Sequence, residues 1–128
     1  QNQILRKKNK IFVTIIRAVK KVDEGPICIQ DTFNLKGHEI YDEIRDKQST
    51  AIFKIVKKYL KKYPNIKFVN QKGKVTFNKR RSFNDNELNI NKSIKSQFNL
   101  LRIVNNDFYP AHFKYKKNTY ILKISKKN

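Results

Sequence analysis

Asp23 is the residue whose type and surroundings most suggest chemistry in this chain of 128 residues. It lies in residues 22–26, where two acidic residues are followed by a glycine and a proline. This composition predicts a turn, and a carboxylate in a turn between two strands can face a cleft. An aspartate in a turn can instead hydrogen-bond its own backbone, so the segment alone leaves both roles open.

The other reactive side chains form no recognisable site in the sequence. One cysteine, Cys28, and two distant histidines, His38 and His112, offer no zinc-ligand spacing, so we expect no metal site. Three glycines cannot build a P-loop or a dinucleotide-binding loop. Ser93 and Ser96 have no potential general base at a sequence spacing that would indicate a catalytic pair. We expect both histidines to lie on the surface or to cap a helix.

The formal net charge of +20 favours an anionic partner. Nucleotide-sugars, tRNA and lipopolysaccharide precursors are candidates, and the pairs Lys20-Lys21 and Arg80-Arg81 could contact phosphate. The excess of lysine, asparagine and isoleucine is also typical of a genome poor in G and C, in which case these side chains are simply solvated. Dedicated phosphate-binding sites more often use arginine.

Strands are predicted on both sides of the Asp23 turn. Residues 11–16 are a β-branched run, and residues 26–30 are a second apolar run of strand length. Continuous apolar runs suit a sheet that is covered on both faces, as in α/β folds.

A long helix is predicted over residues 37–63, with acidic residues in its first turns, lysines in its last turns, and Pro64 after it. Its apolar stripe comprises Ile40, Ile44, Ala51, Ile52, Ile55, Val56, Tyr59 and Leu60.

Shorter elements are expected after this helix: strands at residues 66–69 and 75–77, a polar connector over residues 78–92, and a helix over residues 92–104. The inward side chains of that helix should be Ile94, Phe98, Leu100 and Leu101. A β-hairpin is predicted from residues 113–115 and 120–124, which flank a polar turn.

Several segments, in order, resemble the formyltransferases that use 10-formyltetrahydrofolate, most closely the C-terminal half of the sugar N-formyltransferases. Residues 13–15 and 21–27 resemble the V-T strand and the D-x-G-x-I motif of that family. The remaining matches lie at residues 31–33, 37–48, 77–81, 85–87, 91–93, 97–102 and 109–113. The resemblance implies an α/β fold: the end of a Rossmann-like sheet with a long helix, followed by a small α+β region that ends in a β-hairpin. Residues 1–70 would belong to the catalytic domain and residues 71–128 to the small C-terminal region.

The resemblance also implies roles for individual residues. Asp23 falls on the catalytic aspartate of the family, and Val19, Lys21 and Val22 fall on the loop that contacts the pterin of 10-formyltetrahydrofolate. Arg102 and Tyr109 would help shape either the sugar-nucleotide end of the site or a dimer contact. Formyl transfer to an amine passes through an oxyanion, and it needs a carbonyl polariser, a proton shuttle and a carboxylate that holds the shuttle. The family supplies an Asn, a His and an Asp.

The Asn-x-His segment of the family is absent from this sequence, so we expect the chain alone to be inactive and to need the missing N-terminal half as a partner. The sequence contains no methionine and begins at Gln1, which suggests a fragment; a processed mature chain is the alternative. The implied acceptor is a nucleotide-linked amino sugar, and a homodimer is compatible with the family. Cytoplasm is the expected location, because one cysteine fits a reducing compartment, and no apolar run is long enough to span a membrane.

Two other interpretations stay open. The chain could be the C-terminal, tRNA-binding part of a methionyl-tRNA formyltransferase, although the region after Thr76 is short for the barrel-like domain of that family. It could also be an inactive remnant of a gene.

Overall fold

The computed structural model describes residues 1–73 and 76–127. The chain forms two compact units, each assembled from separate stretches of sequence. The strand–helix unit contains Lys10–Asn34 and Arg45–Phe77, and the terminal unit contains Gln1–Asn9, Leu35–Ile44 and Asn78–Asn128. The sequence analysis expects a boundary between residues 70 and 71 that separates a catalytic domain from a C-terminal region. The two compact units do not test that boundary, so it stays a prediction.

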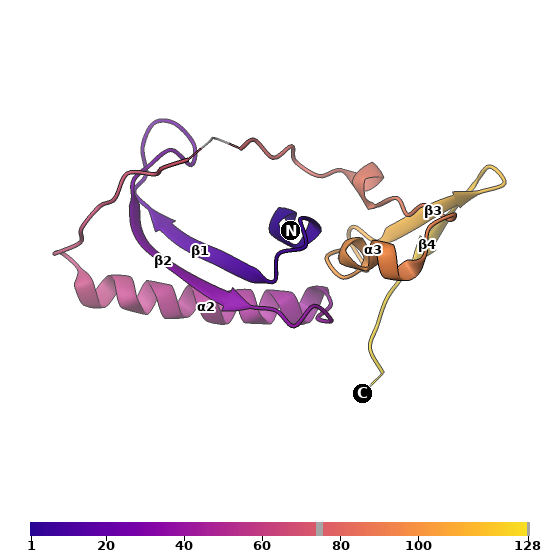
Figure 1. Ribbon diagram of the computed structural model, residues 1–128, viewed down its shortest axis with the longest axis horizontal. Coiled ribbons are helices and arrows are strands. Elements are labelled where there is room, and N and C mark those ends of the chain that lie inside the picture. Colours follow the sequence, from indigo (N-terminus) through magenta and orange to yellow (C-terminus); the bar gives the residue numbers. More distant parts are fainter. Residues whose placement is uncertain (74–75, 128) are drawn as a thin grey trace. The chain divides into compact units, whose positions relative to one another are not determined.

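Two antiparallel strands form the sheet of the strand–helix unit (Figure 1). β1 (Lys10–Ile16) pairs with β2 (Ile27–Asn34), and the register is irregular between Ile15 and Ile16. Both predicted strands are confirmed, and β2 continues further than its apolar run. Exposed and half-buried residues alternate along most of β1. The expected cover on both faces of the sheet is therefore not seen for β1 in the part of the chain described.

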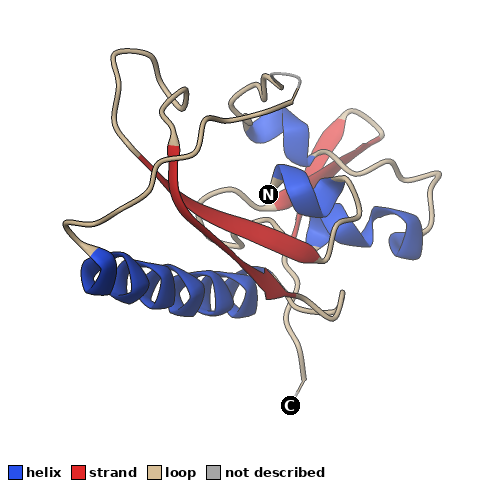
Figure 2. Ribbon diagram, turned by 60° about the vertical axis from the view of Figure 1, so that its left-hand side comes forward, coloured by secondary structure: helices blue, strands red, loops and turns tan. Residues whose placement is uncertain are grey.

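The long helix is confirmed as α2 (Tyr41–Lys62), which runs alongside the two strands in both views (Figures 1 and 2). It begins later than expected because the Glu43 carboxylate accepts a hydrogen bond from the backbone N–H of Ile40, at 2.8 Å. Its acidic first turn and basic last turn complement the helix dipole, as predicted. Pro64 follows directly after Tyr63 and disfavours helical backbone there.

The apolar stripe of α2 divides between covered and uncovered positions. Ala51 and Ile55 are buried, with exposed fractions of 8% and 2%. Ile52, Val56 and Leu60 lie on the surface, and the exposed fraction of Leu60 is 64%. The predicted apolar stripe is therefore buried at some positions and exposed at these three. Among the described residues, no helix combines the length and apolar character that crossing a bilayer requires.

The core of the terminal unit contains Leu88, Leu101, Val104 and Ala111, and half-buried apolar side chains pack against it. α3 (Ile94–Leu101) begins after Ser93, whose side chain accepts a hydrogen bond from the backbone of Ser96. Both ends of α3 lie inside the predicted helix. Leu101 is buried as expected, whereas Ile94 is 67% exposed, so its predicted inward position is wrong.

The predicted C-terminal hairpin is confirmed as β3 (Ala111–Tyr115) paired with β4 (Asn118–Leu122). Lys116 and Lys117 form its turn, with φ of 46° and 66°. Positive φ at both central residues is the signature of a type I′ turn, which matches the twist of the flanking strands.

The segment between α2 and α3 contains less regular structure than predicted. Residues 66–69 form no strand beyond one bridge between Val69 and Ile27. Thr76 and Phe77 lie outside any strand, and Val75 lies outside the described residues. Two short helices were not predicted, α1 (Asn2–Leu5) and the 3-10 helix η1 (Phe83–Asn86). Four residues are too few to give a recognisable apolar period.

Candidate functional site

The loop that connects β1 to β2 carries Asp23. We call residues 17–26 the Asp23 loop. Its base is closed by a hydrogen bond from the Arg17 N–H to the Pro26 carbonyl, at 2.9 Å. Gly25 is buried where the loop folds back, and a Cβ at this position would lie 1.7 Å from the Arg17 carbonyl oxygen. The glycine therefore allows a close approach within the loop's own backbone.

Gln71 holds the loop from outside. Its side-chain amide nitrogen donates to the carbonyls of Asp23 and Gly25, at 2.7 Å in each case. The neighbouring residue pair Val69 and Ile27 exchanges two backbone hydrogen bonds. Val69, in the segment predicted to be a strand, and Gln71, just after that segment, thus brace the Asp23 loop and its end at Ile27.

Asp23 has exposed surface and a φ of 59°, in the left-handed region where aspartate is tolerated better than most residues. In the described parts of the chain, its carboxylate takes part in no hydrogen bond and no ion pair. The alternative role, an aspartate that bonds its own turn, is therefore not seen. The next acidic residue differs, because Glu24 pairs with Lys21 at 3.4 Å.

The three residues expected to contact the pterin lie in the same loop. Val19 and Val22 expose 47% and 87% of their surface, and the Lys21 side chain is 77% exposed. The structure thus brings Asp23, Val19, Lys21 and Val22 together. Their contact with a folate stays a prediction.

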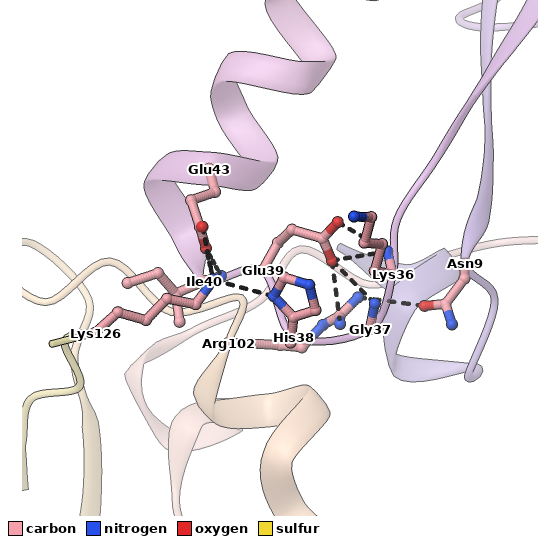
Figure 3. Close-up of polar contacts among 9 residues, drawn as sticks. All are labelled: Asn9, Lys36, Gly37, His38, Glu39, Ile40, Glu43, Arg102 and Lys126. Carbon is pink, nitrogen blue, oxygen red and sulfur yellow. Dashed lines mark hydrogen bonds and ion pairs between the residues drawn. The ribbon is translucent and has the colours of Figure 1, made fainter. Parts of the chain in front are cut away.

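Arg102 and Tyr109, the residues expected near the sugar-nucleotide, lie in the terminal unit. Tyr109 is 61% exposed and lines a cavity. Arg102 has no exposed surface, and its guanidinium lies 3.9 Å from the Glu39 carboxylate and 3.4 Å from the Asn9 side-chain oxygen (Figure 3). Burial lowers the pKa of Arg102, and the carboxylate of Glu39 partly opposes this effect. This burial argues for a role in folding, and substrate contact by Arg102 stays a prediction.

Glu39 links the segment before α2 to Arg102. Its carboxylate accepts hydrogen bonds from the backbone N–H groups of Lys36 and Gly37 (Figure 3). Gly37 has a φ of 100°, which favours glycine. Sequence reasoning identified neither Glu39 nor Asn9, because nothing local indicates which distant side chain will meet a buried arginine.

The two histidines have different surroundings. His38 is exposed, as expected, and its Nδ1 lies 3.2 Å from the Lys126 ammonium, which also binds Glu43 (Figure 3). His112 is fully buried and stacks on Phe83, with ring centroids 3.9 Å apart. The expectation of a surface or capping role is therefore wrong for His112, whose aromatic neighbour lies far away in sequence. No group of three or more potential metal ligands occurs within residues 1–73 and 76–127.

Solved structures of formyltransferases and HypX share this fold. A methionyl-tRNA formyltransferase from Clostridium thermocellum superposes with a TM-score of 0.82 and 21% identity, over 99% of this chain and 55% of the other. A 4-N formyltransferase from Francisella tularensis superposes with a TM-score of 0.71 and 17% identity, over 99% of this chain and 55% of the other. A HypX variant from Aquifex aeolicus superposes with a TM-score of 0.78 and 16% identity, over 95% of this chain and 23% of the other.

The chain thus spans about half the length of the two formyltransferases. No family model matches its sequence. The search of curated proteins also found no match. The mixed α/β arrangement corresponds to the C-terminal part of the formyltransferases. The resemblance that the sequence motifs indicated is therefore confirmed at the level of the fold, which this chain shares with the formyltransferases.

Proposed function

We propose that this chain is the C-terminal portion of a formyltransferase that transfers a formyl group from 10-formyltetrahydrofolate to the amine of a nucleotide-linked amino sugar. The observation that carries the proposal is the position of Asp23. A carboxylate that has no partner among the described residues lies in a braced loop, at the motif position of the family's catalytic aspartate, within a fold shared with formyltransferases.

The described residues fit one side of a folate site. Val22 offers apolar surface, which suits a flat pterin ring, and Val19 and Lys21 flank it in the same loop. The donor would supply an activated formyl group. This chain would supply the Asp23 carboxylate, which can orient a histidine and stabilise its protonated form.

The proposal requires a second half that provides an asparagine to polarise the formyl oxygen and a histidine to move the proton. Asp23 would then act through that histidine. An oriented carboxylate beside a histidine fixes its tautomer, and loss of the negative charge removes this effect even where the shape is kept.

The test uses the complete polypeptide encoded by the reading frame that contains residues 1–128. Asp23→Asn keeps the shape and removes the charge, and we expect kcat to fall about 10²–10⁴-fold. Glu24→Gln is the matched control, because Glu24 lies in the same loop and pairs with Lys21 at the surface. Equal activities of the two variants would contradict the role of Asp23.

A second candidate function, action on tRNA, is favoured by the net charge of +20 and by the fold shared with a methionyl-tRNA formyltransferase. Filter binding of tRNA to residues 1–128 tests it. Affinity that falls steeply with salt would support this function, and the absence of binding at low salt would eliminate it.

A further inference from the structure

Gln71 makes contacts that the sequence motifs did not indicate. Its side-chain nitrogen lies 2.7 Å from the carbonyl oxygen of Asp23 and 2.7 Å from that of Gly25. An amide nitrogen carries two hydrogens, so it can donate one to each carbonyl. Both distances lie at the short end of the range for N–H···O hydrogen bonds. One side chain thus holds the peptide unit that follows Asp23 and the one that follows Gly25.

A backbone bridge determines where the Gln71 side chain lies. Val69 exchanges two backbone hydrogen bonds with Ile27, at 2.8 and 2.9 Å. Ile27 is the first residue of β2, so the bridge attaches this segment to the end of the Asp23 loop. All of these residues belong to the strand–helix unit. The bridge therefore places Gln71 beside the loop, from a part of the chain 46 to 48 residues away.

The backbone conformation of Asp23 requires support of this kind. Its φ of 59° lies in the left-handed region, which a residue with a Cβ adopts at a cost in free energy. Such conformations persist only where surrounding contacts hold them, and they are found often at active sites. Two hydrogen bonds correspond to about a 10- to 100-fold change in the population of the conformation that they hold. Loss of the Gln71 amide should therefore let Asp23 populate other conformations.

We infer that Gln71 is a positioning residue, which holds the backbone of Asp23 so that the carboxylate is directed at a histidine. The inference rests on the proposed function, because the direction of this carboxylate affects the rate only if it orients the histidine that moves the proton. Gln71 would act through Asp23 alone. It is exposed, so substitutions at this position should not prevent folding.

The kcat of the complete polypeptide tests the inference with two substitutions. Gln71→Met keeps an unbranched side chain and removes the donor without adding charge, so kcat should fall about 10- to 100-fold at every pH. Gln71→Glu introduces a carboxylate, which cannot donate while it is ionised, so at about pH 8 its kcat should be as low as that of Gln71→Met. Relative to the wild type, the kcat of Gln71→Glu should rise toward about pH 5.5. The two facing carbonyls favour the protonated carboxyl, whose O–H can donate to one of them.

Gln30→Glu is the matched control, because it makes the same chemical change at another exposed glutamine of the same unit. The Gln30 amide donates to the Thr14 hydroxyl at 3.0 Å, from β2 to β1. Its kcat should match that of the wild type at both pH values. A wild-type kcat in Gln71→Met would overturn the inference. So would a kcat of Gln71→Glu that, relative to the wild type, does not change with pH.

Amide hydrogen exchange of the same polypeptides measures the loop without formyl transfer. The Arg17 N–H donates to the Pro26 carbonyl at 2.9 Å, and it should exchange faster in Gln71→Met than in Gln30→Glu. Equal exchange would overturn the inference even if kcat falls. An Asp23→Asn variant as active as the wild type would contradict the proposed function instead, and the exchange of Arg17 would then decide separately whether Gln71 holds the loop.

Discussion

The Asp23 carboxylate stands apart from the acidic side chains that the fold uses for its own stability. Four carboxylates have a pKa below the ordinary value, and each accepts a hydrogen bond from a lysine or from Ser82: Asp31, Glu43, Asp85 and Glu87. Within the described residues, the carboxylate of Asp23 has no such partner. Exposed carboxylates such as Asp46 share this property, so the position of Asp23 in the braced loop, at the motif position of the family's aspartate, is what supports the proposed function.

The pH dependence of stability should report on Asp31. A hydrogen bond from Lys58 and one from the Thr32 backbone lower its pKa from 3.8 to about 2. Because the folded-state pKa is the lower one, this carboxylate contributes stability above about pH 4, and the contribution is lost as the pH falls toward 2. Chemical unfolding measured at several pH values should show a weaker acid dependence in Asp31→Asn than in the wild type.

Asp46→Asn is the control for this measurement, since Asp46 is an exposed carboxylate on the same unit. An acid dependence that is identical in the wild type and in Asp31→Asn would refute the contribution of the Asp31–Lys58 pair.

Gly25→Ala should disturb the Asp23 loop. The new Cβ would lie 1.7 Å from the Arg17 carbonyl oxygen, so the backbone must move. We expect a loss of about 1–3 kcal/mol in the free energy of unfolding, as for other overpacked sites. Urea denaturation measures this loss, and Glu24→Ala, at the exposed neighbouring position, should change stability far less. An unchanged stability of Gly25→Ala would mean that the loop does not close as described.

The candidate site could be predicted only in part from the sequence. The motif around Asp23 predicts the loop, because the motif is contiguous, and the catalytic role of Asp23 is part of the proposed function. Gln71 could not be found in this way, since its partners lie 46 to 48 residues away. The burial of Arg102 was missed for the same reason, because Asn9 is 93 residues distant.

At the scale of the elements, the local sequence pattern was sufficient to predict a helix, strand or turn where that element's own residues determine its limits. The β-branched runs, the long apolar period of α2 and the polar turn of the hairpin each predicted an element that is present. The prediction was wrong where contact with a distant segment of the chain determines the structure. Residues 66–69 have strand composition but form a single bridge, and the stripe of α2 is buried only in part.

The turn between β3 and β4 offers a test of this local control. Lys117 has a φ of 66°, a conformation that costs a residue with a Cβ about 1–2 kcal/mol. We expect Lys117→Gly to raise the free energy of unfolding by about 0.5–1 kcal/mol. Glycine removes the backbone strain, and its larger loss of chain entropy on folding offsets part of this gain. Lys117→Ala removes the same charge but keeps the Cβ. Equal stabilities of the two variants, measured by thermal unfolding, would contradict a strained turn.

At the scale of the whole molecule, the fold is that of about half a formyltransferase. Large apolar side chains remain on the surface of α2, including Phe53 at 69% and Leu60 at 64% exposure. We propose that the donor-binding half covers part of this surface. Under this proposal, residues 1–128 carry one carboxylate of the catalytic set, and the asparagine and the histidine lie in the other half.

Formyl transfer by the isolated chain and by the complete polypeptide tests this central claim most directly. The measurement follows the release of tetrahydrofolate from 10-formyltetrahydrofolate in the presence of a nucleotide-linked amino sugar. We predict turnover by the complete polypeptide, a large loss in its Asp23→Asn variant, and none by residues 1–128 alone. Turnover by residues 1–128 alone, or no turnover by a complete polypeptide that contains the asparagine and the histidine, would contradict the account.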